Sequence, residues 1–165
     1  MGDALDSLRE QKVVPVAGDW RYGRIYSRTQ IFEAWLILER SETGWLTEIR
    51  KIPCPRKLDC DTDGGLKNPD ESIWKNPGNA NPEHGDAVYE MRSRPTPGGH
   101  ANQCSYDIHG EIMTGIPEGG TTDFAAHALP NFIPHYLHDY RPWKLAEILN
   151  RRDDYQGNVK VNLVG

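Results

Sequence analysis

The sequence has no hydrophobic run long enough to cross a membrane and no apolar segment near its start. No stretch approaches the roughly 18 consecutive apolar residues that a membrane-spanning helix needs. The first residues include several acids and lack the apolar core of a secretory signal peptide. We therefore expect no membrane span, and a protein that is cytoplasmic when made and is secreted, if at all, without a cleavable signal peptide.

Basic side chains are outnumbered: 19 Lys and Arg stand against 24 Asp and Glu, a net charge of −5. Nucleic-acid binding depends on clustered Lys and Arg that contact phosphates. The densest basic pairs here, Arg50–Lys51 and Arg56–Lys57, are separated by prolines. The composition therefore argues against nucleic acid as a partner.

Cysteine is scarce, with three residues in the chain, and an odd number excludes a framework in which every cysteine is paired. Reduced thiols are the expectation for a protein made in the cytoplasm. The sequence also lacks a CxxC pair and an HExxH motif, so neither common zinc signature is present.

What the chain has in abundance is glycine and proline, together with aromatic residues that can fill the core of one domain, 1–165. Apolar spacing predicts a helix over 29–40 whose stripe of Ile31, Trp35 and Leu38 packs on the sheet. Short Gly/Pro turns join strand-like runs and predict a mainly antiparallel α+β fold. The expected strands are 45–52, 89–91 and a hairpin over 103–116, the expected short helices begin near Pro134 and Pro142, and residues 53–86 are expected to form a long irregular loop.

Residues 59–70 match the template of a calcium-binding loop. Hard cations prefer several oxygen ligands, and alternate acidic residues in a tight loop direct their side chains to one point. A solvated acidic turn is the competing interpretation, because Asp and Gly favour turns for backbone reasons. If calcium binds, the side-chain ligands are Asp59, Asp61, Asp63 and Asp70.

Cys104 is the candidate nucleophile, because a thiolate close to an imidazole is reactive. The nearby His100 lies too far along a strand to reach it, so the base would come from His127, His135 or His138. The alternative is that Cys104 is a small residue facing the core. Candidates to orient the base are Asp107, Asp123 and Asp139.

The same histidines offer a second chemistry. On a helix opened by Pro134, the residues His135, His138 and Asp139 share neighbouring faces, a spacing that can hold one transition metal. The alternative interpretation makes the two histidines partly exposed helix residues and Asp139 a cap for the helix at Pro142.

Three short patterns stand out in the chain: Asn102-Gln103-Cys104-x-Tyr106-Asp107-x-x-Gly110-x-Ile112, Gly120-Thr121-x-Asp123 and His138-Asp139-x-x-Pro142. Together they resemble small bacterial domains that are encoded with, or fused to, type VI secretion spike and Rhs-like toxin proteins. The resemblance covers about a third of the chain and implies an antibacterial effector or accessory domain, with an immunity protein or a secretion spike protein as partner. Ser105 stands where a second cysteine is common in the first pattern, which removes a vicinal disulfide.

Three functions remain open from the sequence. The first is a hydrolytic toxin with a Cys/His site, and the second is a noncatalytic binding or adaptor domain whose 53–86 loop is the contact surface. A weaker third is an NAD-handling toxin, suggested by Arg24 and Ser27. Fold alone does not choose among them.

Overall fold

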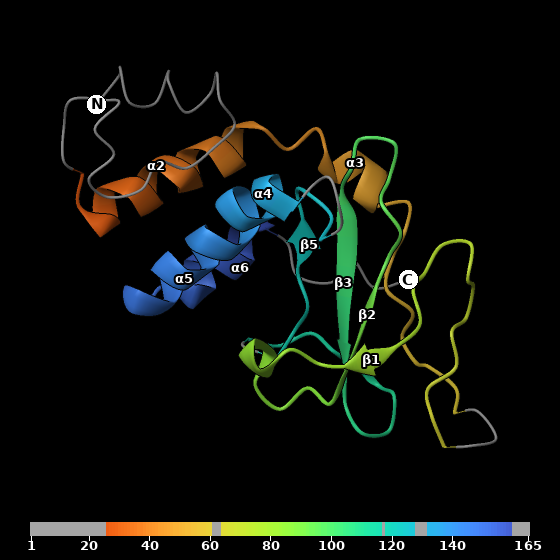
Figure 1. Cartoon of the computed structure of the whole chain (residues 1–165). Coiled ribbons are helices and arrows are strands. Elements are labelled where there is room, and N and C mark those ends of the chain that lie inside the picture. Colours follow the sequence, from red (N-terminus) through yellow and green to blue (C-terminus); the bar gives the residue numbers. More distant parts are fainter. Residues whose placement is uncertain (1–25, 61–63, 117, 128–131, 160–165) are drawn as a thin grey trace.

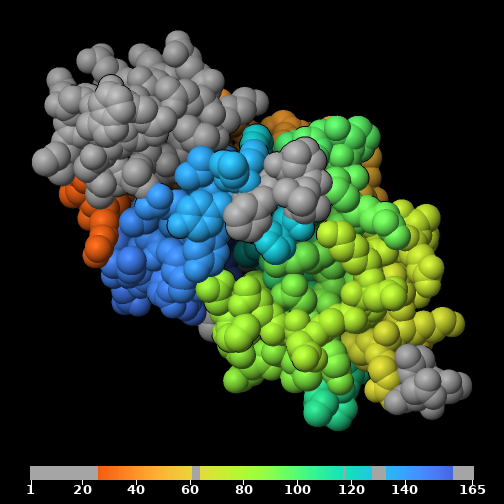
Figure 2. All heavy atoms as spheres, in the orientation of Figure 1, coloured from red at the N-terminus to blue at the C-terminus, as the bar shows by residue number. Residues whose placement is uncertain are grey.

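The computed structural model describes residues 26–60, 64–116, 118–127 and 132–159 of the chain. It is an α+β fold, as predicted, with a sheet on one side and a group of helices on the other (Figure 1). Figure 2 shows helical residues, in blue, and sheet and loop residues, in green and yellow, on opposite sides of one face. The elements are α2 (Arg28–Ser41), α3 (Leu46–Ile49), β1 (Gly78–Asn79), the 3-10 turn η2 (Pro82–His84), β2 (Tyr89–Arg92), β3 (Ala101–Tyr106), β4 (Ile112–Met113), β5 (Thr122–Asp123), α4 (Phe132–His135), the π-helical turn η3 (Tyr136–Tyr140), α5 (Arg141–Ile148) and α6 (Arg152–Val159).

The sheet has five strands, and each of its pairings is antiparallel. Strand β3 is its centre: all six of its residues are buried, and it pairs with β2, β4 and β5. Strand β4 pairs with the end of β3 at Ser105 and Tyr106, whereas β5 pairs with its start at Ala101 and Asn102. Figure 1 shows β5 between β3 and the C-terminal helices.

The predicted hairpin is confirmed as β3 and β4. Its turn begins at Asp107, whose Oδ1 accepts hydrogen bonds from the backbone N–H groups of His109, at 2.8 Å, and Glu111, at 2.9 Å. Gly110 has φ +73°, a conformation that a side chain would disfavour. Asp107, a candidate to orient a catalytic base, is therefore part of the turn.

Helix α2 confirms the prediction over 29–40 and is longer at each end. Ser27 forms a capping box with Gln30, and the apolar stripe is buried. The stripe packs on the C-terminal helices and not on the sheet, as the shared cluster of Ile31, Phe32, Trp35, Leu36, Ala146 and Tyr155 shows.

The strand predicted over 45–52 is wrong, because residues 46–49 form the short helix α3. The buried side chains are Leu46 and Ile49, three positions apart, which is helical spacing and not the alternation of a strand. Thr47 donates its hydroxyl to the carbonyl of Gly44 at 2.7 Å, which supports this helical turn.

The expectation of reduced thiols is also wrong for two of the three cysteines. Cys54 and Cys104 form a disulfide across 50 positions of the sequence, and Cys60 is free and exposed. The bond ties the start of the irregular segment to β3. Around it lies a second apolar cluster, made of Cys54, Leu58, Trp74, Met91, Cys104 and Tyr106.

The segment 53–86 is largely irregular, with the two-residue strand β1 and the turn η2 as its regular elements. Isolated bridges at Lys57 and Trp74 attach it to the sheet. Further along the chain, α4, η3 and α5 follow one another without a break, and Pro142 lies in the first turn of α5 as predicted. None of the described helices is long and apolar enough to cross a membrane.

Candidate functional site

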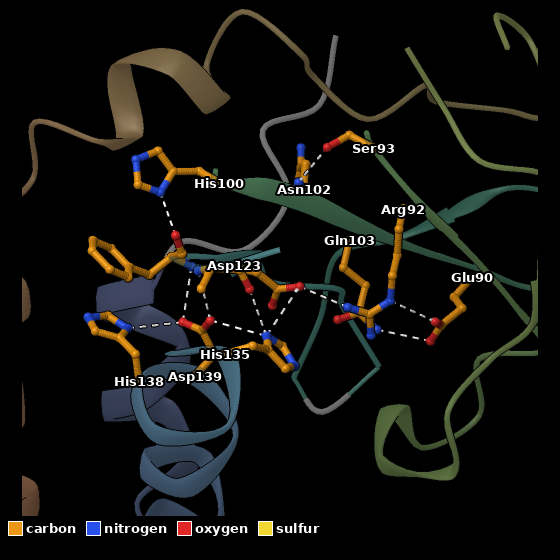
Figure 3. A network of polar contacts seen from close by, with 12 residues as sticks. Glu90, Arg92, Ser93, His100, Asn102, Gln103, Asp123, His135, His138 and Asp139 are labelled. Atoms are coloured by element: carbon orange, nitrogen blue, oxygen red, sulfur yellow. Dashed lines mark hydrogen bonds and ion pairs between the residues drawn. The ribbon is translucent and has the colours of Figure 1, made fainter. Parts of the chain in front are cut away.

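Polar side chains from the sheet and from the helices meet at one small pocket (Figure 3). Gln103 comes from β3, Asp123 from β5, His135 from α4 and Asp139 from η3. The pocket has a volume of about 60 Å³, and these four residues line it together with others from η2 and α5. Residues from all three patterns of the sequence resemblance therefore converge here.

Asp139 is the hub of the network. Its Oδ1 accepts the backbone N–H of Phe124 and Nδ1–H of His138, both at 3.0 Å. Its Oδ2 accepts the N–H of Ala125 at 3.1 Å and Nδ1–H of His135 at 3.2 Å. Burial alone would raise the pKa of Asp139, but the hydrogen bonds from the two histidines hold that pKa below its ordinary value. Asp139 is therefore a buried carboxylate that is ionised at neutral pH.

His135 has a defined tautomer. Its Nδ1 lies 2.9 Å from the carbonyl oxygen of Ala125, 3.2 Å from Asp139 Oδ2 and 3.9 Å from Asp123 Oδ2. All three neighbours are acceptors, so the proton belongs on Nδ1 and the neutral ring has its lone pair on Nε2. Burial opposes protonation, but the hydrogen bond to Asp139 and the charges of Asp123 and Asp139 raise the pKa of His135.

Asp123 behaves differently from Asp139. Burial, together with the charges of Asp139 and Glu90, raises the pKa of Asp123 to about 6, although the charge of Arg92 opposes this. Arg92 Nη1 lies 2.8 Å from Asp123 Oδ2, and Arg92 Nε lies 3.0 Å from Glu90 Oε1. The site thus holds two carboxyl groups whose pKa values are pushed apart, an arrangement typical of acid–base sites.

Gln103 forms the sheet side of the pocket. Its side-chain amide donates to Glu90 Oε2 at 2.9 Å and to Nε2 of His84 at 2.8 Å. Burial lowers the pKa of His84, which keeps this ring neutral and able to accept. A Cβ on Gly120 would lie 2.1 Å from the carbonyl oxygen of Gln103, so only glycine lets the two segments approach this closely.

His138 points away from the pocket toward α2. Its Nε2 lies 2.9 Å from Glu39 Oε1, and its Nδ1 bonds Asp139. Burial works against the charge, but hydrogen bonds to both carboxylates raise the pKa of His138 to about 10. His138 is therefore a buried cation that joins α2 to η3, and the structure does not bring it together with His135 around one metal ion.

Asp123, His135 and Asp139 do offer three ligand atoms within 4.8 Å of one another. The donor set is nevertheless engaged in other bonds. The Nδ1 of His135 needs its proton for the carbonyl of Ala125, and both oxygens of Asp139 accept N–H groups. Arg92 already supplies positive charge to Asp123. In this arrangement the three residues suit a charge network better than a metal.

Two of the other predicted catalytic residues lie apart from the lining of the pocket. The sulfur of Cys104 is bonded to Cys54 and the residue is fully buried, so this form of the protein has no Cys104 thiolate to act as a nucleophile. His127 is exposed, with its ring 5.0 Å from that of His135. Arg24 and Ser27 were the two residues that suggested an NAD-handling toxin. Ser27 caps α2, and Arg24 lies outside the described residues.

The predicted calcium loop is described at its two ends. Asp59 and Asp70 are exposed, while Asp61 and Asp63 lie outside the described residues. The carbonyl of Asp59 accepts the N–H of Lys67 at 2.7 Å, which holds the loop closed. The carboxylate of Asp70 accepts from the backbone N–H and hydroxyl of Ser72, at 2.8 and 2.6 Å.

Sequence reasoning did not single out Arg92, Glu90 or Glu39 as site residues. Each acts through contacts with segments far away in the sequence, and no local spacing marks them. Gln103 is part of the first of the three sequence patterns, and that pattern was the signal that could have marked it as a site residue. Comparisons with family models, with curated proteins and with solved structures find no match to this chain, so its function is argued from the site itself.

Proposed function

We propose that the protein is a hydrolase in which His135 is the general base and Asp139 holds it in place. The proposal rests on the 3.2 Å contact between His135 Nδ1 and Asp139 Oδ2. Both side chains line the pocket. A histidine whose Nδ1–H is held by a carboxylate presents the lone pair of Nε2 to the proton that it removes.

Water is the nucleophile in this proposal. The pocket has room for a few water molecules, and no serine or cysteine is among its described lining residues. Nε2 of His135 takes a proton from the water while the water oxygen forms a bond to the electrophilic centre of the substrate. The bond between that centre and the leaving group then breaks, and the imidazolium of His135 returns the proton to the leaving group. The imidazolium that forms is stabilised by the neighbouring carboxylates of Asp139 and Asp123.

The sequence patterns support a role as an antibacterial toxin of a secretion system. Gln103, Asp123 and Asp139, one from each of the three patterns, all line this pocket. The Cys54–Cys104 disulfide favours an oxidising compartment such as the periplasm as the place of action. The partners proposed in this setting are an immunity protein that blocks the pocket and a spike protein that delivers the domain.

A growth assay tests the proposal. The domain is expressed in the cytoplasm or, with an added export signal, in the periplasm of a bacterium that lacks an immunity partner. We expect toxicity in the periplasm and its loss in His135→Gln, because glutamine can still donate to Asp139 but cannot accept the proton. His109→Gln is the matched control, since His109 is an exposed residue of the hairpin turn.

Melting temperatures of the purified variants separate loss of chemistry from loss of fold. A folded His135→Gln variant that remains as toxic as the wild-type domain would refute the assignment of the base. A wild-type domain that is harmless in both compartments would favour the noncatalytic adaptor.

We also infer that residues 59–70 bind calcium, on the basis of the acidic spacing and the closure of the loop by Asp59 and Lys67. Binding to the folded state raises the melting temperature by mass action. We expect a higher melting temperature in millimolar calcium than in chelator, and a smaller difference in Asp59→Asn. Identical melting curves in calcium and chelator would end this proposal.

A further inference from the structure

A second pocket lies beyond Phe124, on the side of the molecule where α2 ends and α3 begins. Its volume is about 410 Å³, and none of its lining residues lines the His135 pocket. The residues that line it are Glu42, Gly44, Trp45, Gly98, His100 and Phe124.

One wall of this pocket is aromatic. The ring centroids of Trp45 and Phe124 are 5.7 Å apart in an edge-to-face arrangement. His100 packs against both, at 5.3 Å from Trp45 and 5.1 Å from Phe124. The three rings therefore form one continuous surface, and the negative faces of aromatic rings attract cations. Phe124 also stacks on His138, with ring centroids 4.1 Å apart, and the carboxylates of Glu39 and Asp139 balance the charge of that histidine.

The polar groups of the pocket are also suited to positive charge. Glu42 contributes a half-buried carboxylate, and no Lys or Arg is among the lining residues that the structure describes. His100 Nδ1 lies 2.5 Å from the carbonyl oxygen of Phe124, so Nδ1 is the nitrogen that donates to this oxygen. A Cβ on Gly98 would lie 2.7 Å from Nε2 of His100, so the backbone of Gly98 packs closely against the His100 ring.

The position at the end of α2 adds to the negative potential. Glu42 is the C-cap of this 14-residue helix, and the carbonyl groups at a helix C-terminus carry partial negative charge. Three features of one pocket thus favour a cation: an aromatic wall, a carboxylate and a helix C-terminus.

We propose that this pocket binds a quaternary ammonium group of the trimethylammonium type. Such a group carries no N–H that would need an acceptor, and its methyl groups spread the charge over a surface that can lie on aromatic rings. The volume suits a ligand of the size of choline. The proposal is independent of the hydrolase, because the two pockets share no lining residue.

The test compares choline with 3,3-dimethyl-1-butanol, which has the same shape without the charge. Titration of the full chain by calorimetry and by NMR is expected to give saturable binding of choline, with shifts at the Trp45 indole, and binding of the neutral alcohol at least about tenfold weaker. A tenfold ratio lies within the range expected for one exposed cation–π contact combined with one exposed ion pair.

Variants locate the site. Glu42→Gln is expected to weaken choline binding about fivefold, in line with the loss of one exposed ion pair, and Trp45→Phe to weaken it further by reducing the aromatic face. Glu33→Gln, which removes a carboxylate elsewhere on α2, and His135→Gln are expected to bind as the wild type does. Equal affinities for choline and the alcohol, or no change in Glu42→Gln, would overturn the proposal.

Discussion

The protonation of His135 is the property on which the proposed chemistry depends, and it can be measured without a substrate. Because Asp139 and Asp123 face the ring, its pKa is expected above the ordinary value for histidine. Titration of the His135 ring by NMR checks this. A pKa of His135 below the ordinary value for histidine, near 6.5, would contradict the prediction.

Asp123→Asn isolates one cause of this shift. Asparagine keeps an oxygen that can accept from Arg92 but removes the charge beside His135, so the pKa of His135 should fall relative to the wild type. Asp153→Asn, on the exposed side of α6, is the matched control and should leave the His135 titration unchanged.

Gly120 allows two segments of the site to approach each other closely. Gly120→Ala would place a methyl group against the backbone of Gln103, and overpacking of this kind costs about 1–3 kcal/mol. Gly157→Ala is the contrasting control, because nothing lies within 4 Å of its added Cβ and helix α6 should gain stability. Denaturant unfolding measures both. Equal stability of the two variants would contradict the close approach.

At the level of residues, the sequence identified His135, Asp123 and Asp139 as candidates through their side-chain chemistry. It did not find Arg92 and Glu39, because their contacts depend on how the sheet and the helices pack. Nor did it predict the disulfide, since the spacing of three cysteines does not say which two come together.

The pair of Glu39 and His138 connects α2 to the helical turn η3. The pKa of His138 is raised in the folded protein to about 10, above the ordinary value near 6.5. The stability that this pair contributes is therefore fully present below about pH 6.5 and is lost as the pH rises through 10, with a slope of at most about 1.4 kcal/mol per pH unit.

Glu39→Gln tests this contribution. Without the carboxylate the pKa of His138 rises less, so the variant should be less stable at pH 7 and should lose less stability between pH 7 and 10. Glu33→Gln, an exposed position of the same helix, is expected to keep the wild-type pH dependence. Denaturant unfolding over this range provides the measurement, and an unchanged slope in Glu39→Gln would refute the role of the pair.

Elements with strong local signals were predictable. Helix α2 has a capping box and an apolar stripe, and the β3–β4 hairpin has a glycine turn between alternating residues. The segment 45–52 was not predictable in the same way, because alternation and helical spacing coexist in so short a run and packing of Leu46 and Ile49 decides between them.

For the molecule as a whole, the disulfide is the largest single constraint on the unfolded chain. Closing a loop of 50 residues is worth about 4 kcal/mol in the chain-entropy model. The variant with both Cys54→Ala and Cys104→Ala should lose stability of that order in denaturant unfolding, and a reducing agent should have a similar effect on the wild-type protein. Cys60→Ser is the control. A melting temperature unaffected by reductant would contradict the pairing.

Two apolar clusters lie within the part of the chain that the structure describes, one among the helices and one around the disulfide in the sheet. Between them runs a row of alternating acidic and basic side chains: Glu90, Arg92, Asp123, His135, Asp139, His138 and Glu39. We expect the two layers to open as separate cooperative units, because neither layer must expose its apolar interior when the other opens. The backbone amides of Phe124 and Ala125, which donate across this boundary to Asp139, are therefore the ones whose exchange with solvent reports the layers coming apart.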